Sequence, residues 1–262
     1  MARHRKSLGL ALIAVLWMVS LLTILATSTL AITRSNARMS LRSAQFVEAS
    51  TVADSVIRLM LARGDSLSID GFSTRQQIEL FDRTIDVRVE HEAGRVDLNA
   101  TEAPLLATVF VAGGLDAEVA ATFASRIIDW RDADDERSAG GAERSDYAIA
   151  KIGYGPRNGP FESVGELQQV LGLSELSSSI LDAFTVYSTR SPTISREYAH
   201  PLIREAVNSS SPTPQSLIGQ AVRVHACTRS YDLMVCRAAV VRLMHGSPAF
   251  LIHAWYTEES SP

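Results

Sequence analysis

The sequence predicts an α+β protein that a single N-terminal helix anchors in a membrane. An uncharged apolar run over residues 8–32 predicts the anchor, and alternating polarity in residues 84–90 and again from residue 222 predicts strands. Between these strands the apolar residues recur at helical spacing. The predicted fold is therefore a long N-terminal helix and an antiparallel sheet, with an all-α insert that interrupts the sheet.

The apolar run is long enough to cross a bilayer. No charged side chain lies between Lys6 and Arg34, and a helix needs about 20 such residues to cross the hydrocarbon. A basic cluster at residues 3–6 precedes the run and should stay in the cytoplasm. The chain after Arg34 should then lie on the far side of the membrane.

The helix should continue beyond the membrane. Residues 34–62 contain no proline or glycine, and their apolar residues recur at steps of three and four, as at Phe46, Ala49, Ala53, Val56 and Met60. We expect one helix over residues 10–62, stopped at Gly64.

Strands flank the insert on both sides. Residues 84–90 should form a strand, 91–94 a turn, and Val96 and Leu98 a short return strand. Residues 222–226, 233–244 and 250–254 predict an antiparallel meander near the C-terminus. Cys227 and Cys236 would lie on neighbouring strands, either as a disulfide or as two buried free thiols.

The insert over residues 99–187 contains two similar pieces. Helices at 104–112 and 117–130 are joined at Gly113-Gly114, and a capping box of Ser163 and Glu166 begins a second pair with its turn at Gly172. Both resemble helix-hairpin-helix units. The Ser, Thr and Pro-rich residues 188–218 should be a linker, most clearly at 208–216.

An acidic loop between the two pieces is the candidate metal site. Asp132, Asp134, Asp135 and Glu143 are hard oxygen ligands of the kind that calcium prefers, and Gly140-Gly141 permits a tight path. The alternative is a solvated acidic loop. Trp130 should pack beneath the loop.

Charge and motif patterns argue against two other functions. Residues 95–190 contain eight Lys or Arg against fifteen Asp or Glu, so the insert lacks the positive potential that DNA binding needs. The six histidines are scattered, and no nucleophile or metal motif accompanies them, so we predict no enzyme.

Several short blocks occur together in one order. They are the leader with Arg5, Lys6 and Gly9; residues 94–99 (GRVDLN); 129–134 (DWRDAD); 141–143; Tyr147; 157–158; 161–167 (FESVGEL); and Gly172. In these blocks the chain resembles the minor pseudopilin K family of bacterial type II (general) secretion systems. The resemblance covers residues 8 to about 186 and thins after Ser188.

The resemblance implies processing at the N-terminus. Prepilin peptidase would cut between Gly9 and Leu10, and Leu10 would become a methylated N-terminus. The alternatives are a secretory signal peptide cut after a small residue such as Ala31, or an uncut anchor. Most pilin-like subunits have a glutamate where this chain has Ala14. The K type lacks it as well, and a subunit with no neighbour above it is better off without an unpaired charge in lipid.

The resemblance also implies an organisation and a function. The expected parts are a leader (1–9), a transmembrane segment (10–33), a pilin-like helix with the first strands (34–98), the insert (99–187), the linker (188–218) and strands that complete a pilin-like sheet (219–262). The function would be that of a minor pseudopilin at the pseudopilus tip, initiating assembly for export of folded proteins, with calcium bound in the insert.

The implied partners are the I and J type minor pseudopilins, the major pseudopilin, prepilin peptidase and the inner-membrane secretion platform, and no nucleic acid. The implied location is the bacterial inner membrane, with a cytoplasmic N-terminus and a periplasmic head. The alternative function is a single-pass anchored periplasmic module that captures a substrate or DNA through the insert.

Overall fold

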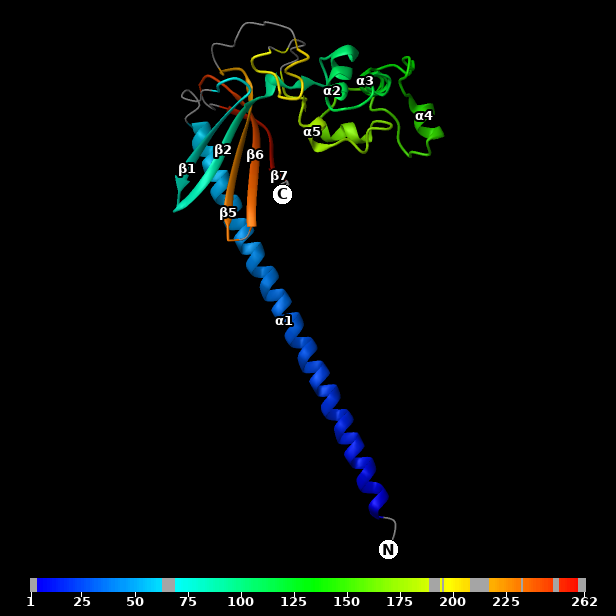
Figure 1. Cartoon of the computed structure of the whole chain (residues 1–262), viewed down its shortest axis with the longest axis vertical. Helices are drawn as coiled ribbons and strands as arrows, with labels where there is room; N and C mark the ends of the chain where they lie inside the picture. Colours follow the sequence, from blue (N-terminus) through cyan, green and yellow to red (C-terminus); the bar gives the residue numbers. More distant parts are fainter. Residues whose placement is uncertain are drawn as a thin grey trace.

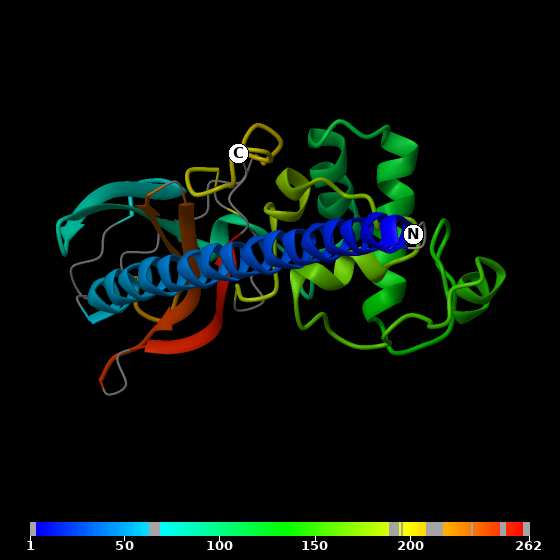
Figure 2. The ribbon, with the colours of Figure 1, turned by 90° about the horizontal axis from the view of Figure 1, so that it is seen from below.

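The computed structural model describes residues 4–62, 69–188, 194, 196–207, 217–231, 233–246 and 250–258, with side chains from residue 12 onward. A long helix carries a head of two parts at one end (Figure 1). One part is a sheet with the helix on one face, and the other is the helical insert. Seen from below, the two parts lie side by side and α1 crosses in front of them (Figure 2). This arrangement confirms the predicted α+β fold class.

Helix α1 (His4–Ala62) is continuous. It begins earlier than the predicted start at Leu10 because nothing in the leader interrupts helical hydrogen bonds except Gly9, which a helix tolerates at about 1 kcal/mol. Among the described residues, it is the one helix long and apolar enough to cross a membrane. Residues 12–44 are exposed, whereas Ala49, Ala53 and Val56 are buried against the sheet. The helix therefore has a free half and a packed half.

The sheet contains five antiparallel strands in the order β1-β2-β5-β6-β7. The strands are β1 (Ser73–Leu80), β2 (Arg83–His91), β5 (Ala221–Ser230), β6 (Leu233–Leu243) and β7 (Phe250–Glu258). The predicted meander near the C-terminus is confirmed. Alternate residues of β2 and β5 point to α1 and form one core with it, including Ile85, Val87, Val222 and Val224.

The first part of the sheet differs from the prediction in two ways. Strand β1 was not predicted, because it is an edge strand with mostly polar residues. A tight turn at Phe81 and Asp82, both with positive φ, joins β1 to β2. Val96 does not return along β2. It lies in β3 (Val96–Asp97), which pairs in parallel with β4 (Phe184–Thr185) and belongs to the core of the insert.

The insert contains one well-formed helix pair. Helices α2 (Ala103–Ala112) and α3 (Ala117–Arg131) have the predicted bounds to within one residue and are joined by the predicted glycine turn. The second predicted pair is wrong. Its capping box is present, but it begins a short 3-10 helix, η3 (Val164–Gln169), and α5 (Ser178–Leu181) is only four residues long. A short helix α4 (Arg144–Ile149), which was not predicted, lies between the two pieces.

Part of the predicted linker is packed rather than extended. Ile194, Ala199, Ile203 and Val207 are buried in the core of the insert, because apolar residues recur there at intervals that the Ser and Pro content obscures. Gly94 allows this segment to pass close to the 3-10 helix η2 (Glu92–Gly94), since a Cβ there would lie 1.9 Å from the Tyr198 carbonyl oxygen. The predicted linker core at 208–216 lies outside the described residues.

A disulfide joins Cys227 and Cys236, which face each other in the pairing of β5 with β6. Their Cα atoms are 4.1 Å apart. The bridge closes the hairpin of these two strands near its turn, on the face opposite α1.

Buried charges join the insert to the sheet. Arg95 is 1% exposed and lies between Glu90 at the end of β2 and Asp182 at the end of the insert, with 3.1 Å between its Nη2 and Asp182 Oδ1. Glu92 is fully buried and accepts a hydrogen bond of 2.6 Å from Nε of Arg223, which belongs to β5. Arg223 also lies 3.1 Å from Asp182. These residues form the junction cluster.

His225 extends the junction cluster along β5. Its Nε2 lies 3.2 Å from Glu90 Oε2, and its Nδ1 lies 2.8 Å from Glu258 Oε1 on β7. Burial lowers the pKa of the imidazole, but the hydrogen bonds to Glu258 and Glu90 outweigh it and raise that pKa. The cluster therefore connects β2, β5, β7 and the insert by charge-assisted hydrogen bonds.

Removing Arg95 should destabilise this junction strongly. Arg95→Met would leave Glu90 and Glu92 buried without their shared cation, and breaking a buried ion network in this way costs about 3–5 kcal/mol. We expect urea unfolding of the full chain in detergent to show a loss of that size. Arg75→Met, at an exposed position of β1, should change the free energy of unfolding by less than about 0.5 kcal/mol. Equal stability of the two variants would contradict the role of the cluster.

Acid should weaken the junction through Glu90. Burial raises the pKa of its carboxyl, but the hydrogen bond with His225 and the charge of Arg95 outweigh it and lower that pKa from 4.5 to about 2. A carboxyl with a lowered pKa stabilises the folded state above its ordinary pKa, and this contribution disappears as the pH falls from about 4.5 to about 2. Unfolding measured across this range should show a steeper loss for the wild type than for Glu90→Gln, and parallel curves would refute the assignment.

Candidate metal centre

The acidic loop connects α3 to α4 and is shaped by its own side chains. Asp129, in the last turn of α3, is fully buried and accepts hydrogen bonds from the backbone N–H of Ser138. The backbone at Gly141 passes so close that a Cβ there would lie 1.9 Å from Asp129 Oδ2. Glycine at this position is therefore required, and the loop folds back over the end of α3.

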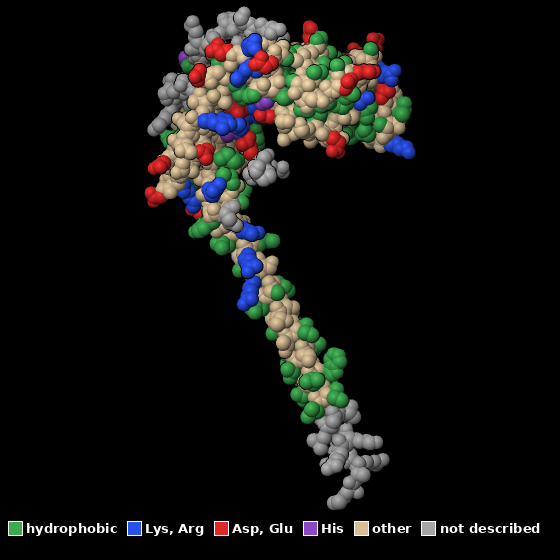
Figure 3. Space-filling model, viewed as in Figure 1, with side chains coloured by type: hydrophobic (Ala, Val, Ile, Leu, Met, Phe, Trp, Pro, Cys, Tyr) green, Lys and Arg blue, Asp and Glu red, His purple; other side chains and the backbone are tan. Residues whose placement is uncertain are grey.

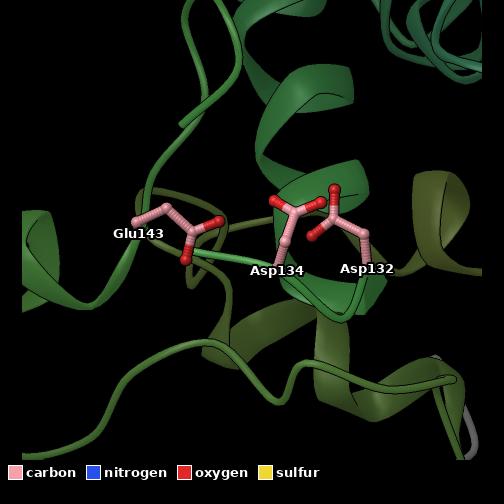
Figure 4. Close-up of side chains that lie close together, drawn as sticks. All are labelled: Asp132, Asp134 and Glu143. Carbon is pink, nitrogen blue, oxygen red and sulfur yellow. The ribbon is translucent and has the colours of Figure 1, made fainter. Parts of the chain in front are cut away.

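Three carboxylates meet inside this loop. One carboxylate oxygen from each of Asp132, Asp134 and Glu143 lies within 4.8 Å of the others. Asp132 and Asp134 come from the chain that leaves α3, and Glu143 faces them from the residue before α4 (Figure 4). We call these three residues the acidic triad.

The acidic triad carries more negative charge than its surroundings balance. Glu143 is 4% exposed, and burial together with the charges of Asp129 and Asp132 raises the pKa of its carboxyl to about 7. Burial and the neighbouring charge of Asp134 also raise the pKa of Asp132. Among the described residues, both oxygens of Glu143 and Oδ1 of Asp132 are buried without a hydrogen-bond partner. Such orphaned oxygens are rare in folded proteins and indicate a missing partner.

A hard divalent cation fits this arrangement. Calcium prefers carboxylate and carbonyl oxygens, and one ion would neutralise the repulsion and satisfy the orphaned oxygens at the same time. Three side chains supply fewer oxygens than the six to eight that calcium takes, so backbone carbonyls or water would have to complete the shell. The geometry of the triad thus fits a hard divalent cation.

Asp135, the fourth predicted ligand, lies outside the triad. Its Oδ1 accepts a hydrogen bond of 3.2 Å from Nδ2 of Asn158, and the same Nδ2 lies 3.3 Å from the Asp134 carbonyl oxygen. Asn158 also donates its backbone N–H to the Trp130 carbonyl oxygen. Asn158 therefore ties the acidic loop to residues 152–160. Our sequence reasoning placed this asparagine in a family block but gave it no role.

An aromatic cluster supports the loop from beneath. Trp130 is 4% exposed and contacts the rings of Tyr147, Tyr154 and Phe161. This agrees with the predicted packing of Trp130. The hydroxyl of Tyr147 accepts a hydrogen bond of 3.0 Å from the Leu171 backbone N–H, so the cluster connects α4 with the turn at Gly172. The triad is thus built on a rigid base.

The other predicted site residues lie far from the triad in the chain. Gly9 and Leu10 are in the first turns of α1, and their side chains lie outside the described residues. Cys227 and Cys236 are bonded in the sheet. His200 and His225 contact carboxylates of the junction cluster. Within the part of the chain that the structure describes, the acidic triad is the one group of metal-ligating residues found.

Comparison with known proteins relates this architecture to a secretion machine. Residues 89–185 match the family model described as type II secretion system (T2SS), protein K. A similar solved structure is a chain of the crystal structure of the GspK-GspI-GspJ complex from the enterotoxigenic Escherichia coli type 2 secretion system. The two chains share 14% sequence identity with a TM-score of 0.59, over 86% of this chain and 100% of that one. No curated protein matches significantly.

The family model and the solved structure match different lengths of the chain. The family model spans the end of β2, the helical insert up to Thr185 and those residues of the junction cluster that lie between them. These parts distinguish this chain from a plain helix and sheet. The solved structure extends the likeness to most of the chain, and at this level of identity the likeness concerns the fold.

Calcium should stabilise the head through Glu143. At calcium a hundredfold above its dissociation constant, binding adds about 2.7 kcal/mol, which raises the melting temperature by about 5–10 °C. We expect this shift in thermal unfolding of the full chain in detergent, and we expect Glu143→Gln to abolish it. In a chelator, Glu143→Gln should be at least as stable as the wild type, because it removes one of several repelling carboxylates.

Glu136→Gln provides a matched control, because Glu136 is an exposed acid of the same loop outside the triad. This variant should keep the full calcium shift. A shift that survives in Glu143→Gln, or that disappears in Glu136→Gln, would exclude the triad as the site.

Proposed function

We propose that this chain is a minor pseudopilin of the type II secretion system protein K family, that it stands at the tip of the pseudopilus and that it helps to start its assembly. The observation that carries the proposal is the position of the insert. It extends sideways from the end of the sheet that lies farthest from the N-terminus of α1 (Figure 1). Subunits of a filament stack along their N-terminal helices, and a body in this position would occupy the space of the next subunit above.

The sequence of α1 supports a terminal position. A buried glutamate near the start of a pilin-like helix would need the terminal amine of a neighbour as its partner. This chain has Ala14 at that place and no acidic residue before Glu48. A subunit with nothing above it loses no ion pair through this alanine, and it avoids an unpaired charge in the hydrocarbon.

The proposed partners act on successive parts of the chain. Prepilin peptidase would remove residues 1–9, and the I and J type minor pseudopilins would pack along the exposed half of α1. The similar solved chain belongs to a complex of GspK, GspI and GspJ, which supports these two partners. The major pseudopilin and the inner-membrane platform would then extend the filament below the three minor subunits. No catalytic role is proposed.

The proposed location follows from the proposed function. The basic cluster at residues 3–6 would lie on the cytoplasmic side of the span, and the head would lie in the periplasm. The disulfide between Cys227 and Cys236 supports an oxidising compartment for the head. In that compartment, calcium at the acidic triad would hold the loop between α3 and α4 in one conformation.

The N-terminus distinguishes a pseudopilin from other anchored proteins. Mass spectrometry of the protein from native membranes should find a chain that begins at Leu10 and carries one methyl group. Gly9→Leu should keep residues 1–9 attached, because a bulky side chain at the cut prevents the extended backbone from entering the peptidase site. Ala31→Leu should be processed like the wild type.

The two variants distinguish cleavage by prepilin peptidase from cleavage by a signal peptidase. If Ala31→Leu blocked processing and Gly9→Leu did not, the chain would be the product of a signal peptidase and the proposed function would fail. An intact N-terminus in the wild type would also contradict the proposed function.

A further inference from the structure

We infer that the exposed half of α1 carries a binding stripe for anionic phospholipid headgroups, formed by Arg34, Arg38 and Arg42. This inference rests on the proposed function in one respect, namely that residues 8–32 span a membrane. Its evidence is the spacing, the direction and the missing counter-charges of these three side chains.

The three arginines lie on one side of α1. They are spaced by four residues, which in a helix of 3.6 residues per turn places neighbours about 40° apart around the axis and about 6 Å apart along it. All three are exposed. In the space-filling view, basic side chains follow the helix between the apolar segment and the head (Figure 3). The stripe therefore covers about 12 Å of the helix directly above the span.

The stripe begins where the hydrocarbon ends. Arg34 follows the last apolar residues of the span, and the headgroup region extends about 5–7 Å beyond the hydrocarbon on each side. Side chains on a helix lean toward its N-terminus, which here means toward the membrane. Arg38 and Arg42 can thus reach back to the headgroups from higher positions, as arginines near a membrane surface do.

Nothing else in the described part of the chain neutralises this charge. Residues 1–47 contain no Asp or Glu, and none of the three arginines forms an ion pair with a described residue. The nearest acid, Glu48, is already paired with Arg83 at 2.6 Å. Three uncompensated guanidinium groups at a membrane surface attract anionic lipid, with about a fivefold gain in affinity per arginine.

Leader removal would make the stripe more important. Before cleavage, Arg3, Arg5 and Lys6 provide positive charge on the opposite side of the span. A mature chain that begins at Leu10 would have lost all three. Within the described part of the chain, the stripe would then be the one cluster of basic side chains next to the span, and it would hold residues 34–42 of α1 at the membrane surface.

Amide hydrogen exchange of the full chain in nanodiscs tests the stripe locally. Residues 34–44 are all exposed, so their exchange should respond to lipid contact. With about a third phosphatidylglycerol in phosphatidylcholine, we expect peptides from this segment to exchange at least about threefold more slowly than in phosphatidylcholine alone. Salt at about 0.5 M should reduce the difference, because it shortens the Debye length to about 4 Å.

Three sets of variants make the test specific. The triple variant R34Q, R38Q and R42Q should lose the slowing, whereas R34K, R38K and R42K should retain most of it because lysine keeps the charge. The control triple variant R75Q, R144Q and R229Q removes the same charge from exposed positions on the head and should behave like the wild type. The lysine variant also controls for effects of replacing the three arginines that do not depend on charge.

Two results would overturn the inference. One is equal exchange of the wild type in both lipid mixtures, including the case in which slowing appears only after the I and J type heads are added. The other is slowing that survives in the glutamine variant. The experiment needs no other secretion component, so a failure at the stripe leaves the pseudopilin assignment intact, and a wrong N-terminus leaves the lipid result intact.

Discussion

The junction cluster is the constraint on which the architecture of the head depends. Arg95 and Glu92 are almost completely buried, and charges in such a place must be paired and hydrogen-bonded. Their partners are Asp182 at the end of the insert and Arg223 on β5, which are far apart in the sequence. The cluster can therefore form only when the insert has folded and both strands of the sheet are in register. The cluster thereby joins the hydrophobic core of the insert to the core between α1 and the sheet.

The same constraint explains how a sheet accommodates so large an insert. Strands β2 and β5 are neighbours although the whole insert lies between them in the chain. The two ends of the insert lie side by side, where β3 pairs with β4. A long connection costs little extra entropy when its ends are held together, since the cost of closing a loop grows only slowly with its length. The insert can therefore carry its own core and the acidic triad without disturbing the sheet against α1.

The sequence predicted the strongly periodic elements well and the irregular ones poorly. The apolar span, α2 with α3 and the last three strands have clear hydrophobic periods, and the structure confirms them. Strand β1 is polar because it is an edge, and Ile194 and residues 196–207 pack through scattered apolar side chains, so neither segment has a periodic signal. At the triad, the sequence named Asp132, Asp134 and Glu143, and the structure brings these three carboxylates together. Residue type could not exclude Asp135, because only the position of Asn158 shows where that side chain is held.

The continuity of α1 has a mechanical consequence. The helix passes from the apolar span into the core beneath the sheet without proline or glycine between residues 10 and 62, so it has no hinge at which to bend. A force applied to the head along the helix axis would thus be transmitted directly to the apolar span of α1. Lifting the head by one turn, about 5 Å, would draw about four residues out of the bilayer. The apolar span and the head would therefore move together along the helix axis, and moving the head away from the membrane would require work to transfer apolar side chains from lipid to water.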